Sequence, residues 1–470
     1  MESIQLWPTS HLNRIRKHYG PDSEGALMRS PAHKITLLGA ALLVGAGLTL
    51  TACSSSGGGS GGGSSTSGTV TIWSSVDPPV QAGLEKKLVA ELAAAKSNIK
   101  INWQTVTNIN QLIITKIQGG GLPDIAYIPQ PGVVKQMQSL GAAKPMNSVV
   151  DMSSLQQNLV PGVLDAGEVG GQLYGLLGSA NVKGLIWYNK PAFTAAGWQV
   201  PTTIPQLMAL ETQMKAKGSA TAPFCMGVAS SGSNGWPATD WLETLIMKDY
   251  GPTVYNGWVA HTVKFVSPQV ENAGNQFSQL LFTPGNVYGG RSAIDSNNFG
   301  TAGNGLFTSP TPKCWMYFQG SFITGFFPAA VQKNLDSSVG VFEFPPLTAG
   351  GQDPIEGGGD MITMLNTNAN TEAVVKLLSQ PQIGDDAAPT SSFISPFKNF
   401  DASLYPNNTT RTVAGLMTHA DHFLFDGSDA MPAQVGAGSF WTQMVAWIGN
   451  QESLNTALAD IDQTWPASSS

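Results

Sequence analysis

The sequence predicts an α/β protein of two lobes, because strand-like and helix-like segments alternate along it. Residues 69–73 (TVTIW) alternate between apolar and polar side chains, as a strand does. Apolar residues then recur at four-residue intervals over Val80–Leu92, which is typical of a helix, and residues 99–104 (IKINWQ) alternate again. A strand, a helix and a strand in this order predict a βαβ unit, in which the two strands lie parallel.

The alternation continues along the chain. A helix is expected over Ile109–Gln118, ended by three glycines, and the apolar strand Asp124–Ile128 follows. Thr203 and Gln206 form a capping box that opens another helix towards Lys217. The remaining strands are expected at 184–188, 224–228, 314–318, 339–344 and 361–365, and the remaining helices at 371–378, 440–449 and 452–464. These elements fit two α/β lobes with mixed, mainly parallel sheets.

The composition bounds the class of protein. The chain has 470 residues, of which 42% are hydrophobic, so it is long enough to bury a large core. Its 24 basic and 31 acidic side chains give a net charge of -7, and no block of basic residues forms an arm. Nucleic acid is therefore not expected as a partner.

The N-terminal segment has the pattern of an export signal. Basic residues lead into Ile35–Leu50, an apolar run shorter than the roughly 20 residues that span a bilayer. Residues 50–53 (LTAC) resemble the bacterial lipobox, whose cysteine sulfur receives a diacylglyceryl group. We expect a signal peptide over residues 1–52, a translation start at Met28 that leaves residues 1–27 untranslated, and a lipid on Cys53. An uncleaved membrane anchor is the alternative.

A tether and one large folded body follow the cysteine. Residues 53–68 are almost entirely Ser and Gly, a composition typical of a flexible, solvated linker. Residues 69–470 are expected to form the folded body, with lobes that are discontinuous in sequence. Because Cys53 is assigned to the lipid, the anchor is expected to hold this body on the extracytoplasmic face of the cell membrane.

The two remaining cysteines, Cys225 and Cys314, are expected to form a disulfide, since an exported chain folds in an oxidising compartment. Two buried free thiols are the alternative. The sequence contains no CxxC motif and no Cys/His cluster, so no metal site is expected.

Several segments within residues 70–465 are similar to the signature segments of one family of transport proteins. The most specific are residues 174–176 (YGL), 184–191 (GLIWYNKP) and 193–201 (FTAAGWQVP), although Leu177 stands where the family has proline. Residues 122–126 (LPDIA) and 136–145 (QMQSLGAAKP) add to the match. These segments resemble the extracytoplasmic solute-binding proteins of sugar ABC transporters, the class typified by maltose-binding protein. Residues 235–242 (GWPATDWL), 313–315 (KCW) and 319–327 (QGSFITGFF) resemble its α-glucoside-binding branch.

The resemblance implies a two-lobed periplasmic-binding-protein-like fold whose hinge closes the lobes around a sugar. It implies a monomer that captures an oligosaccharide, such as an α-glucoside, and delivers it to ABC permease subunits powered by a separate ATPase. It implies no enzymatic activity and no cofactor. A lipid-anchored glycoside hydrolase is the alternative, because two suitably placed carboxylates would suffice for hydrolysis. A surface adhesin is a third reading.

A sugar site needs aromatic rings for the apolar faces of a pyranose and carboxylates or amides for its hydroxyls. Trp236, Asp240 and Trp241 offer both at the start of a helix that begins near Pro237. The alternative is that Trp241 and Leu245, spaced four residues apart, form the buried face of that helix.

Other candidates follow from their positions beside strands. Trp73 and Asp77 come after the first strand, at the carboxyl end where parallel sheets bind ligands. Gln130 follows another strand in the same sense, and Asn181 precedes the strand at 184–188.

Three further candidates lie later in the chain. Gln319 and Phe322 follow the strand at 314–318, and Asp360 follows three glycines that would let backbone approach a ligand. A tight turn is the alternative for the glycines, and core packing is the alternative for Phe322. Trp441 and Trp447 are interpreted as helix packing.

Overall fold

The structure of the chain is a computed structural model, and it describes residues 67–350 and 353–467. The expected signal peptide, Cys53 and nearly all of the expected tether lie outside the described residues. Within the described part of the chain, no helix is both long and apolar enough to cross a membrane.

The first sheet contains the βαβ unit expected from the sequence. Its strand order is β12-β11-β3-β1-β2, and β6 also pairs with β11. β1 lies parallel to β2 and β3, whereas β11 runs antiparallel to β3 and β6. We call the elements packed on this sheet lobe 1. Its strands are β1 (Ser67–Ser74), β2 (Asn98–Thr105), β3 (Ile125–Ile128), β6 (Leu176–Val182), β11 (Ile355–Met364) and β12 (Phe423–Phe425).

The second sheet is smaller and forms the centre of lobe 2. Its order is β10-β7-β9-β8, with β8 parallel to β9 and the other two pairs antiparallel. Its strands are β7 (Leu185–Asn189), β8 (Ala222–Cys225), β9 (Cys314–Phe318) and β10 (Val339–Glu343), and β4 (Glu168–Val169) and β5 (Gln172–Leu173) form a separate hairpin. The sheets are mixed as expected. Parallel pairs do not predominate among the described residues, because β7 and β11 both return antiparallel to their neighbours.

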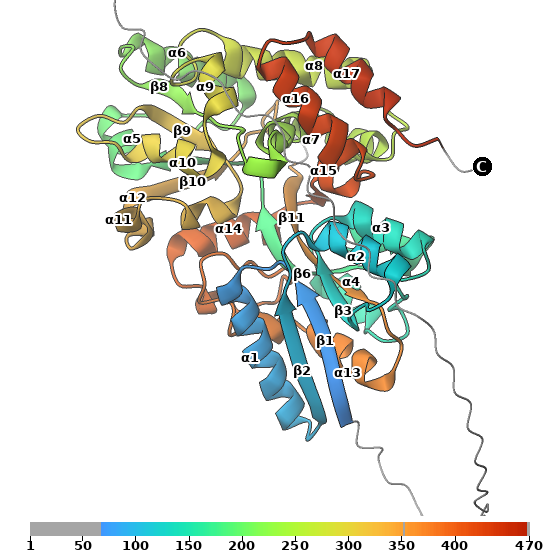
Figure 1. The fold of residues 1–470 in the computed structure, drawn as a ribbon. Helices are drawn as coiled ribbons and strands as arrows, with labels where there is room; N and C mark the ends of the chain where they lie inside the picture. Colours follow the sequence, from blue (N-terminus) through green and yellow to red (C-terminus); the bar gives the residue numbers. More distant parts are fainter. Residues whose placement is uncertain (1–66, 351–352, 468–470) are drawn as a thin grey trace, which may run out of the picture. The chain divides into compact units, whose positions relative to one another are not determined.

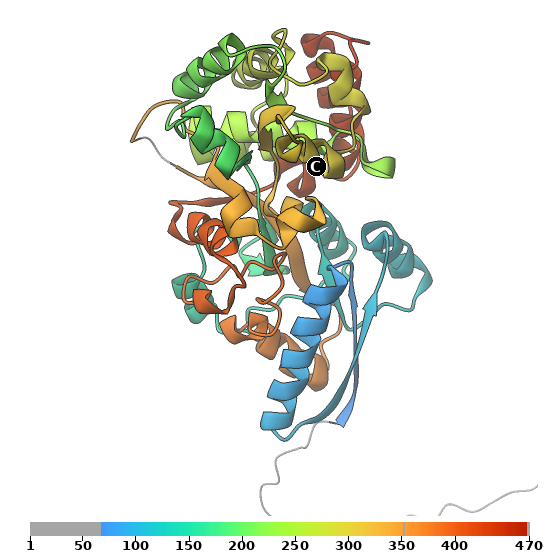
Figure 2. The ribbon, with the colours of Figure 1, turned by 90° about the vertical axis from the view of Figure 1, so that its left-hand side faces the viewer.

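Helices cover both sheets (Figures 1 and 2). In both views α1 lies along β1 and β2. The helices near lobe 1 are α1 (Pro78–Ala94), α2 (Ile109–Gly119), α3 (Pro131–Ser139), α4 (Met152–Asn158), α13 (Ala369–Leu378) and α14 (Asn408–His419). The others are α5 (Lys190–Ala196), α6 (Ile204–Ala216), α7 (Trp236–Val259), α8 (Pro268–Phe277), α9 (Arg291–Ser296), α10 (Phe299–Ala302), α11 (Ala329–Gln332), α12 (Leu335–Ser338), α15 (Gly427–Ala430), α16 (Trp441–Ile448) and α17 (Leu454–Gln463).

Three segments carry the chain between the lobes. The first joins β6 to β7 through Lys183, the second joins β10 to β11, and the third leaves β12 at Asp426 and enters α15. Two apolar clusters meet at the second sheet, where Trp187 of β7 packs into one and its neighbour Ile186 packs into the other. Both faces of that sheet are therefore covered.

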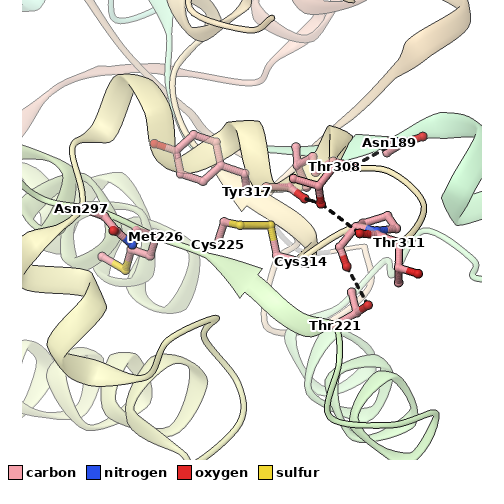
Figure 3. Close-up of a disulfide and its surroundings, with 12 residues drawn as sticks. Asn189, Thr221, Cys225, Met226, Asn297, Thr308, Thr311, Cys314 and Tyr317 are labelled. Atoms are coloured by element: carbon pink, nitrogen blue, oxygen red, sulfur yellow. Dashed lines mark hydrogen bonds between the residues drawn. A yellow bond between two sulfur atoms is a disulfide. The ribbon is translucent and has the colours of Figure 1, made fainter.

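The disulfide expected from the sequence is present (Figure 3). It joins Cys225, at the end of β8, to Cys314, at the start of the neighbouring strand β9, across 89 residues of sequence. Beside it, Thr221 donates a hydrogen bond to the carbonyl oxygen of Pro312 (2.7 Å), which fastens the same two strands. The two cysteines are buried, and their bond lies within lobe 2.

Candidate functional site

One cavity between the lobes is lined by carboxylates on one side and phenylalanines on the other. Its volume is about 290 Å³. Lobe 1 contributes residues after β1 and on β6 and β11, and lobe 2 contributes the 3-10 turn Ser321–Gly325 and Phe326. We call it the Phe322 cavity. It is lined by Ser75, Val76, Asp77, Val80, Pro129, Ser179, Asn181, Phe322, Phe326, Asp360 and Ser392.

The fold brings Asp77 and Asp360 to this cavity from distant parts of the sequence. Asp77 is the N-cap of α1 but makes no side-chain capping bond, so its carboxylate stays exposed. Asp360 sits at a register shift where β11 pairs with β6. Burial, reinforced by the Asp77 charge, raises the pKa of Asp360 to about 7. The structure thus brings together four of the sequence candidates in one cavity: Asp77, Asn181, Phe322 and Asp360.

Trp236 continues the aromatic wall beside Phe322. Its ring centroid lies 5.7 Å from that of Phe322 and 4.9 Å from that of Phe299, both edge-on. The indole nitrogen donates a hydrogen bond to the Ser230 hydroxyl (3.0 Å), and the Lys183 ammonium lies 5.5 Å from the ring centroid. Trp236 is partly exposed, so its ring is both held in place and accessible.

A second cavity between the lobes has a volume of about 530 Å³ and a lining of amides with one tryptophan. We call it the Trp441 cavity. It is lined by Asn108, Asn110, Gln111, Ile114, Gln130, Val133, Gln136, Gly232, Ser233, Ala433, Ala437 and Trp441. None of these side chains is charged.

Hydrogen bonds fix the polar groups at the edge of the Trp441 cavity. Asn110 donates to the Gln130 amide oxygen (2.9 Å), and Gln130 in turn donates to the Asp429 carboxylate (2.9 Å). Trp441 donates through its indole nitrogen to the Ser428 hydroxyl (3.3 Å). Gln130 belongs to lobe 1, whereas Asp429 lies on α15, so this chain of bonds crosses between the lobes.

Gly235 lets the two tryptophan segments approach each other. Its φ of +109° is in the region that favours glycine, and a Cβ there would lie 2.3 Å from the carbonyl oxygen of Trp441. Only glycine therefore fits between Trp236 and Trp441 without moving the backbone of one of them.

Asp240 lies in a buried cluster of charges behind the cleft. Lys183 donates hydrogen bonds to Asp240 (3.1 Å) and to Asp426. Asp426 also accepts from the Ser428 hydroxyl and the Asp429 backbone N–H, both at 2.8 Å. The carboxylates of Asp240, Glu356 and Asp426 place oxygens within 4.8 Å of one another. The Lys183 ammonium is the cation that pairs with two of them.

The cluster joins the three inter-lobe segments to α7. Lys183 lies on the first segment, Glu356 just after the second, and Asp426 on the third. From α7, Glu243 accepts backbone hydrogen bonds from Gly427 (2.5 Å) and Ser428 (3.2 Å), and the Thr244 hydroxyl donates to Glu356 (2.5 Å). The cluster therefore connects lobe 2 to every segment that leads to lobe 1.

Burial and mutual repulsion control the charges in this cluster. Burial raises the pKa of Asp240 to about 7 despite the attraction of Lys183, and it raises the pKa of Asp429 to about 8. The pKa values of Glu243 and Glu356 are raised well above their usual range for the same reason. Although burial opposes its ionisation, Lys183 and nearby donors lower the pKa of Asp426. Lys183 and Asp426 are thus the charged pair of the cluster.

Five candidates from the sequence line neither cavity: Trp236 and Asp240, described above, and Trp73, Trp241 and Gln319. Trp241 is 1% exposed, and its ring packs against Phe318 (4.3 Å between centroids), so it belongs to the core of lobe 2. Gln319 is also buried, and its side-chain oxygen accepts from the backbone N–H of Gly320 (2.8 Å). Trp73 is partly exposed on β1 and packs against the first core cluster. Trp241 and Leu245 therefore form the buried face of α7, which was the alternative to a role in sugar binding.

Trp441, Asp429 and Phe326 line or border the cleft but were not candidates from the sequence. The sequence predicts helix packing for both Trp441 and Trp447, but of the two only Trp447 packs in the core, and Trp441 lines the cavity. Asp429 follows Asp426 in a short helix, DGSDA, that carries no periodic signal. The signal available in the sequence was Asp426, which directly follows the apolar strand β12 and is the N-cap of α15.

Comparison with known proteins agrees with this architecture. A model of the bacterial extracellular solute-binding protein family matches residues 77–379, which is more than half of the chain. The chain belongs to the bacterial extracellular solute-binding protein family. The resemblance noted from the sequence segments is therefore confirmed.

Two relatives of this solute-binding protein cover most of its length. The osmoprotective compounds-binding protein GgtB of Synechocystis sp. is 34% identical over 79% of this chain and 86% of its own. The alpha-glucosides-binding periplasmic protein AglE of Rhizobium meliloti is 31% identical over 78% of this chain and 81% of its own.

Solved structures of solute-binding proteins share the fold at low sequence identity. The bacterial solute receptor AcbH superposes with a TM-score of 0.71 at 17% identity, covering 84% of this chain and 98% of its own. The sugar-binding protein MalE from Xanthomonas citri superposes with a TM-score of 0.65 at 16% identity, covering 84% and 96%. The expected two-lobed solute-binding fold is confirmed.

Proposed function

We propose that this solute-binding protein captures an oligosaccharide of the α-glucoside class between its lobes and delivers it to the permease of an ABC importer. A separate ATPase subunit powers the import, and the solute-binding protein acts as a monomer without a cofactor. The observation that carries the proposal is the lining of the cleft, where accessible aromatic rings stand beside amides and carboxylates. The names of the two relatives above, one of which binds alpha-glucosides, support the sugar class.

The chemistry of each cavity suits part of a sugar. Trp441 offers an indole face for the apolar C–H face of a pyranose, and the amides of Asn110 and Gln130 offer donors and acceptors for its hydroxyls. Phe322 and Asp77 offer the same two kinds of contact in the other cavity. The lobes approach each other at both cavities, so hinge closure would bury a ligand between them.

Calorimetric titration of the protein with a panel of α-glucosides tests the proposal. We expect saturable binding of at least one, and we expect Trp441→Ala to weaken it by about 1 to 2 kcal/mol, roughly 5- to 30-fold, through loss of the stacked ring. Trp465→Ala is the matched control, because Trp465 is also partly exposed but stacks on His261 (4.0 Å) and lines neither cavity. Equal affinity of both variants would remove Trp441 from the site.

Product analysis after long incubation separates binding from hydrolysis. A glycoside hydrolase would release monosaccharide from the bound α-glucoside, whereas a transport receptor returns it intact. We expect no turnover, in keeping with relatives that are named as binding proteins. Release of free glucose by the purified protein would replace the transport reading with the enzymatic one.

The lipid anchor is part of the same proposal. We infer that export, cleavage before Cys53 and diacylglyceryl attachment hold the protein near its permease. Cys53→Ser is expected to release the protein from the membrane fraction and to reduce sugar uptake, while the purified variant keeps its affinity. Normal uptake by cells that carry only the unanchored variant would contradict this role.

A further inference from the structure

The Phe322 cavity is acidic and has no basic side chain in its lining. Of its eleven lining residues, Asp77 and Asp360 are acidic, and none of the others is Lys, Arg or His. Lys183, the cation of the buried cluster, does not line the cavity and is bonded to Asp240 and Asp426. The cavity therefore has two carboxylates with no cation of the protein to balance them.

The two carboxylates also lack hydrogen-bond donors. Among the described residues, no side chain or backbone N–H donates a hydrogen bond to either carboxylate. The hydroxyl of Tyr127, on the strand next to β11, is fully buried without a partner, and the Asp360 charge acts on it. Asp77 is exposed, but buried polar groups are usually paired, so the unpaired Asp360 favours a ligand that donates hydrogen bonds.

Aromatic rings stand on the opposite wall. Phe322 and Phe326 come from lobe 2, and Phe326 is 48% exposed even though it is a large apolar side chain. The face of an aromatic ring attracts a cation, and a desolvated cation strengthens that attraction. A cavity with carboxylates on one wall and phenyl rings on the other favours a positively charged group.

We propose that the Phe322 cavity binds the protonated amino group of an amine-bearing sugar, with Asp77 and Asp360 as its counter-charges and Phe322 and Phe326 against its apolar side. This inference deepens the proposed function and rests on it, because it assigns a charge class to the sugar. Ser75, Ser179 and Asn181 supply hydroxyl and amide groups for the rest of the ring.

The contrast with the Trp441 cavity makes the assignment specific. That cavity is lined only by neutral side chains, so it has no preference for a charged ring. A ligand with an anionic substituent, such as a phosphate, would meet repulsion from Asp77 and Asp360 with no cation to offset it.

Calorimetry at pH 7 and low salt with charge-matched sugars tests the inference. The first set is trehalose, its 2-amino and 6-amino analogues and trehalose 6-phosphate, and the second pair is glucose and glucosamine. We expect at least one amine to bind about tenfold more tightly than its neutral parent, because the ammonium gains charge-assisted hydrogen bonds. We expect the phosphate to bind more weakly than trehalose.

Variants locate the preference in the cavity. Asp77→Asn and Asp360→Asn keep the shape and the acceptor oxygen but remove one ionisable carboxyl group each, and each is expected to bring the amine-to-neutral affinity ratio close to one. Asp165→Asn is the control for net charge, because that carboxylate is 65% exposed and lines neither cavity between the lobes described above. It is expected to keep the ratio of the parent protein.

The outcomes separate the inference from the proposed function. If amines bind and neutral sugars do not, the α-glucoside assignment fails while the charge preference stands. If neutral sugars bind and no amine binds more tightly, the charge preference fails while the transport function stands. Absence of binding by every amine, or a preference that survives both Asn variants, overturns the inference.

Discussion

Lys183→Met is the sharpest test of the buried cluster, because Lys183 supplies its positive charge. The substitution keeps an unbranched side chain of similar length and removes hydrogen bonds to both Asp240 and Asp426. Asp426 keeps the Ser428 and Asp429 donors, whereas the second oxygen of Asp240 already lacks a partner. Breaking a buried pair by removing one partner costs about 3 to 5 kcal/mol, and we expect a loss in that range at pH 8.

The loss should depend on pH. In the parent protein the pKa of Asp426 is lowered, so its ionised form stabilises the fold above its unfolded pKa of about 3.9, and this contribution disappears as the pH falls. Without Lys183 the pKa of Asp426 rises, so the group is neutral in acid and its buried charge destabilises the fold as the pH increases. The difference in unfolding free energy should therefore be smaller at pH 5 than at pH 8.

Urea unfolding of both proteins at the two pH values measures this difference. Lys100→Met is the control, because Lys100 is exposed on β2 and forms none of the salt bridges among the described residues. Its effect should stay within about 0.5 kcal/mol. A Lys183→Met loss below about 1 kcal/mol, or one that does not change between pH 5 and pH 8, would refute the assignment of Lys183 and Asp426 as the charged pair.

Three further predictions concern stability. Burial raises the pKa of Glu211 to about 8, so the stability that its neutral form contributes is lost as the pH rises through that value. Glu211→Gln keeps an oxygen for Asn286 and should flatten the fall in unfolding free energy between pH 6 and pH 9. An unchanged slope would contradict this. Gly235→Ala should lower the unfolding free energy by about 1 to 3 kcal/mol and weaken sugar binding, as urea titration and calorimetry would measure. The double substitution Cys225→Ser with Cys314→Ser should lower it by up to about 4.5 kcal/mol, and a protein unaffected by reductant would refute that estimate.

The elements with a strong local signal were predictable from the sequence. The spacing of apolar residues gave β1, α1 and β2 to within two residues, and the Thr203 cap gave the start of α6, where Thr203 accepts from the Gln206 N–H. The second half of the capping box differs, because the Gln206 side chain accepts from Thr202 instead of Thr203. The expected strand at 361–365 is part of the longer β11, whose glycine-rich first half has no alternating pattern.

The site was predictable only in part, because it depends on tertiary contacts. Strand ends located Asp77, and proximity to strands located Asn181 and Phe322, all of which line a cavity. Trp241 and Trp441 both lie in the first two turns of a helix, and only the packing of α7 and α16 decides that one is in the core and the other faces the cleft. The three glycines before Asp360 allow close strand contact, since a Cβ on Gly359 would lie 2.0 Å from the Ser179 carbonyl oxygen.

The placement of the disulfide has a practical consequence for recombinant work. Both cysteines belong to adjacent strands of one sheet, so the bond reinforces lobe 2 and places no restraint on movement at the hinge. Material produced in a reducing host would therefore be less resistant to heat and protease, yet the fraction that folds should still open and close on its ligand. A fluorescent reporter of closure could accordingly be attached to this protein and calibrated without first restoring the oxidised form.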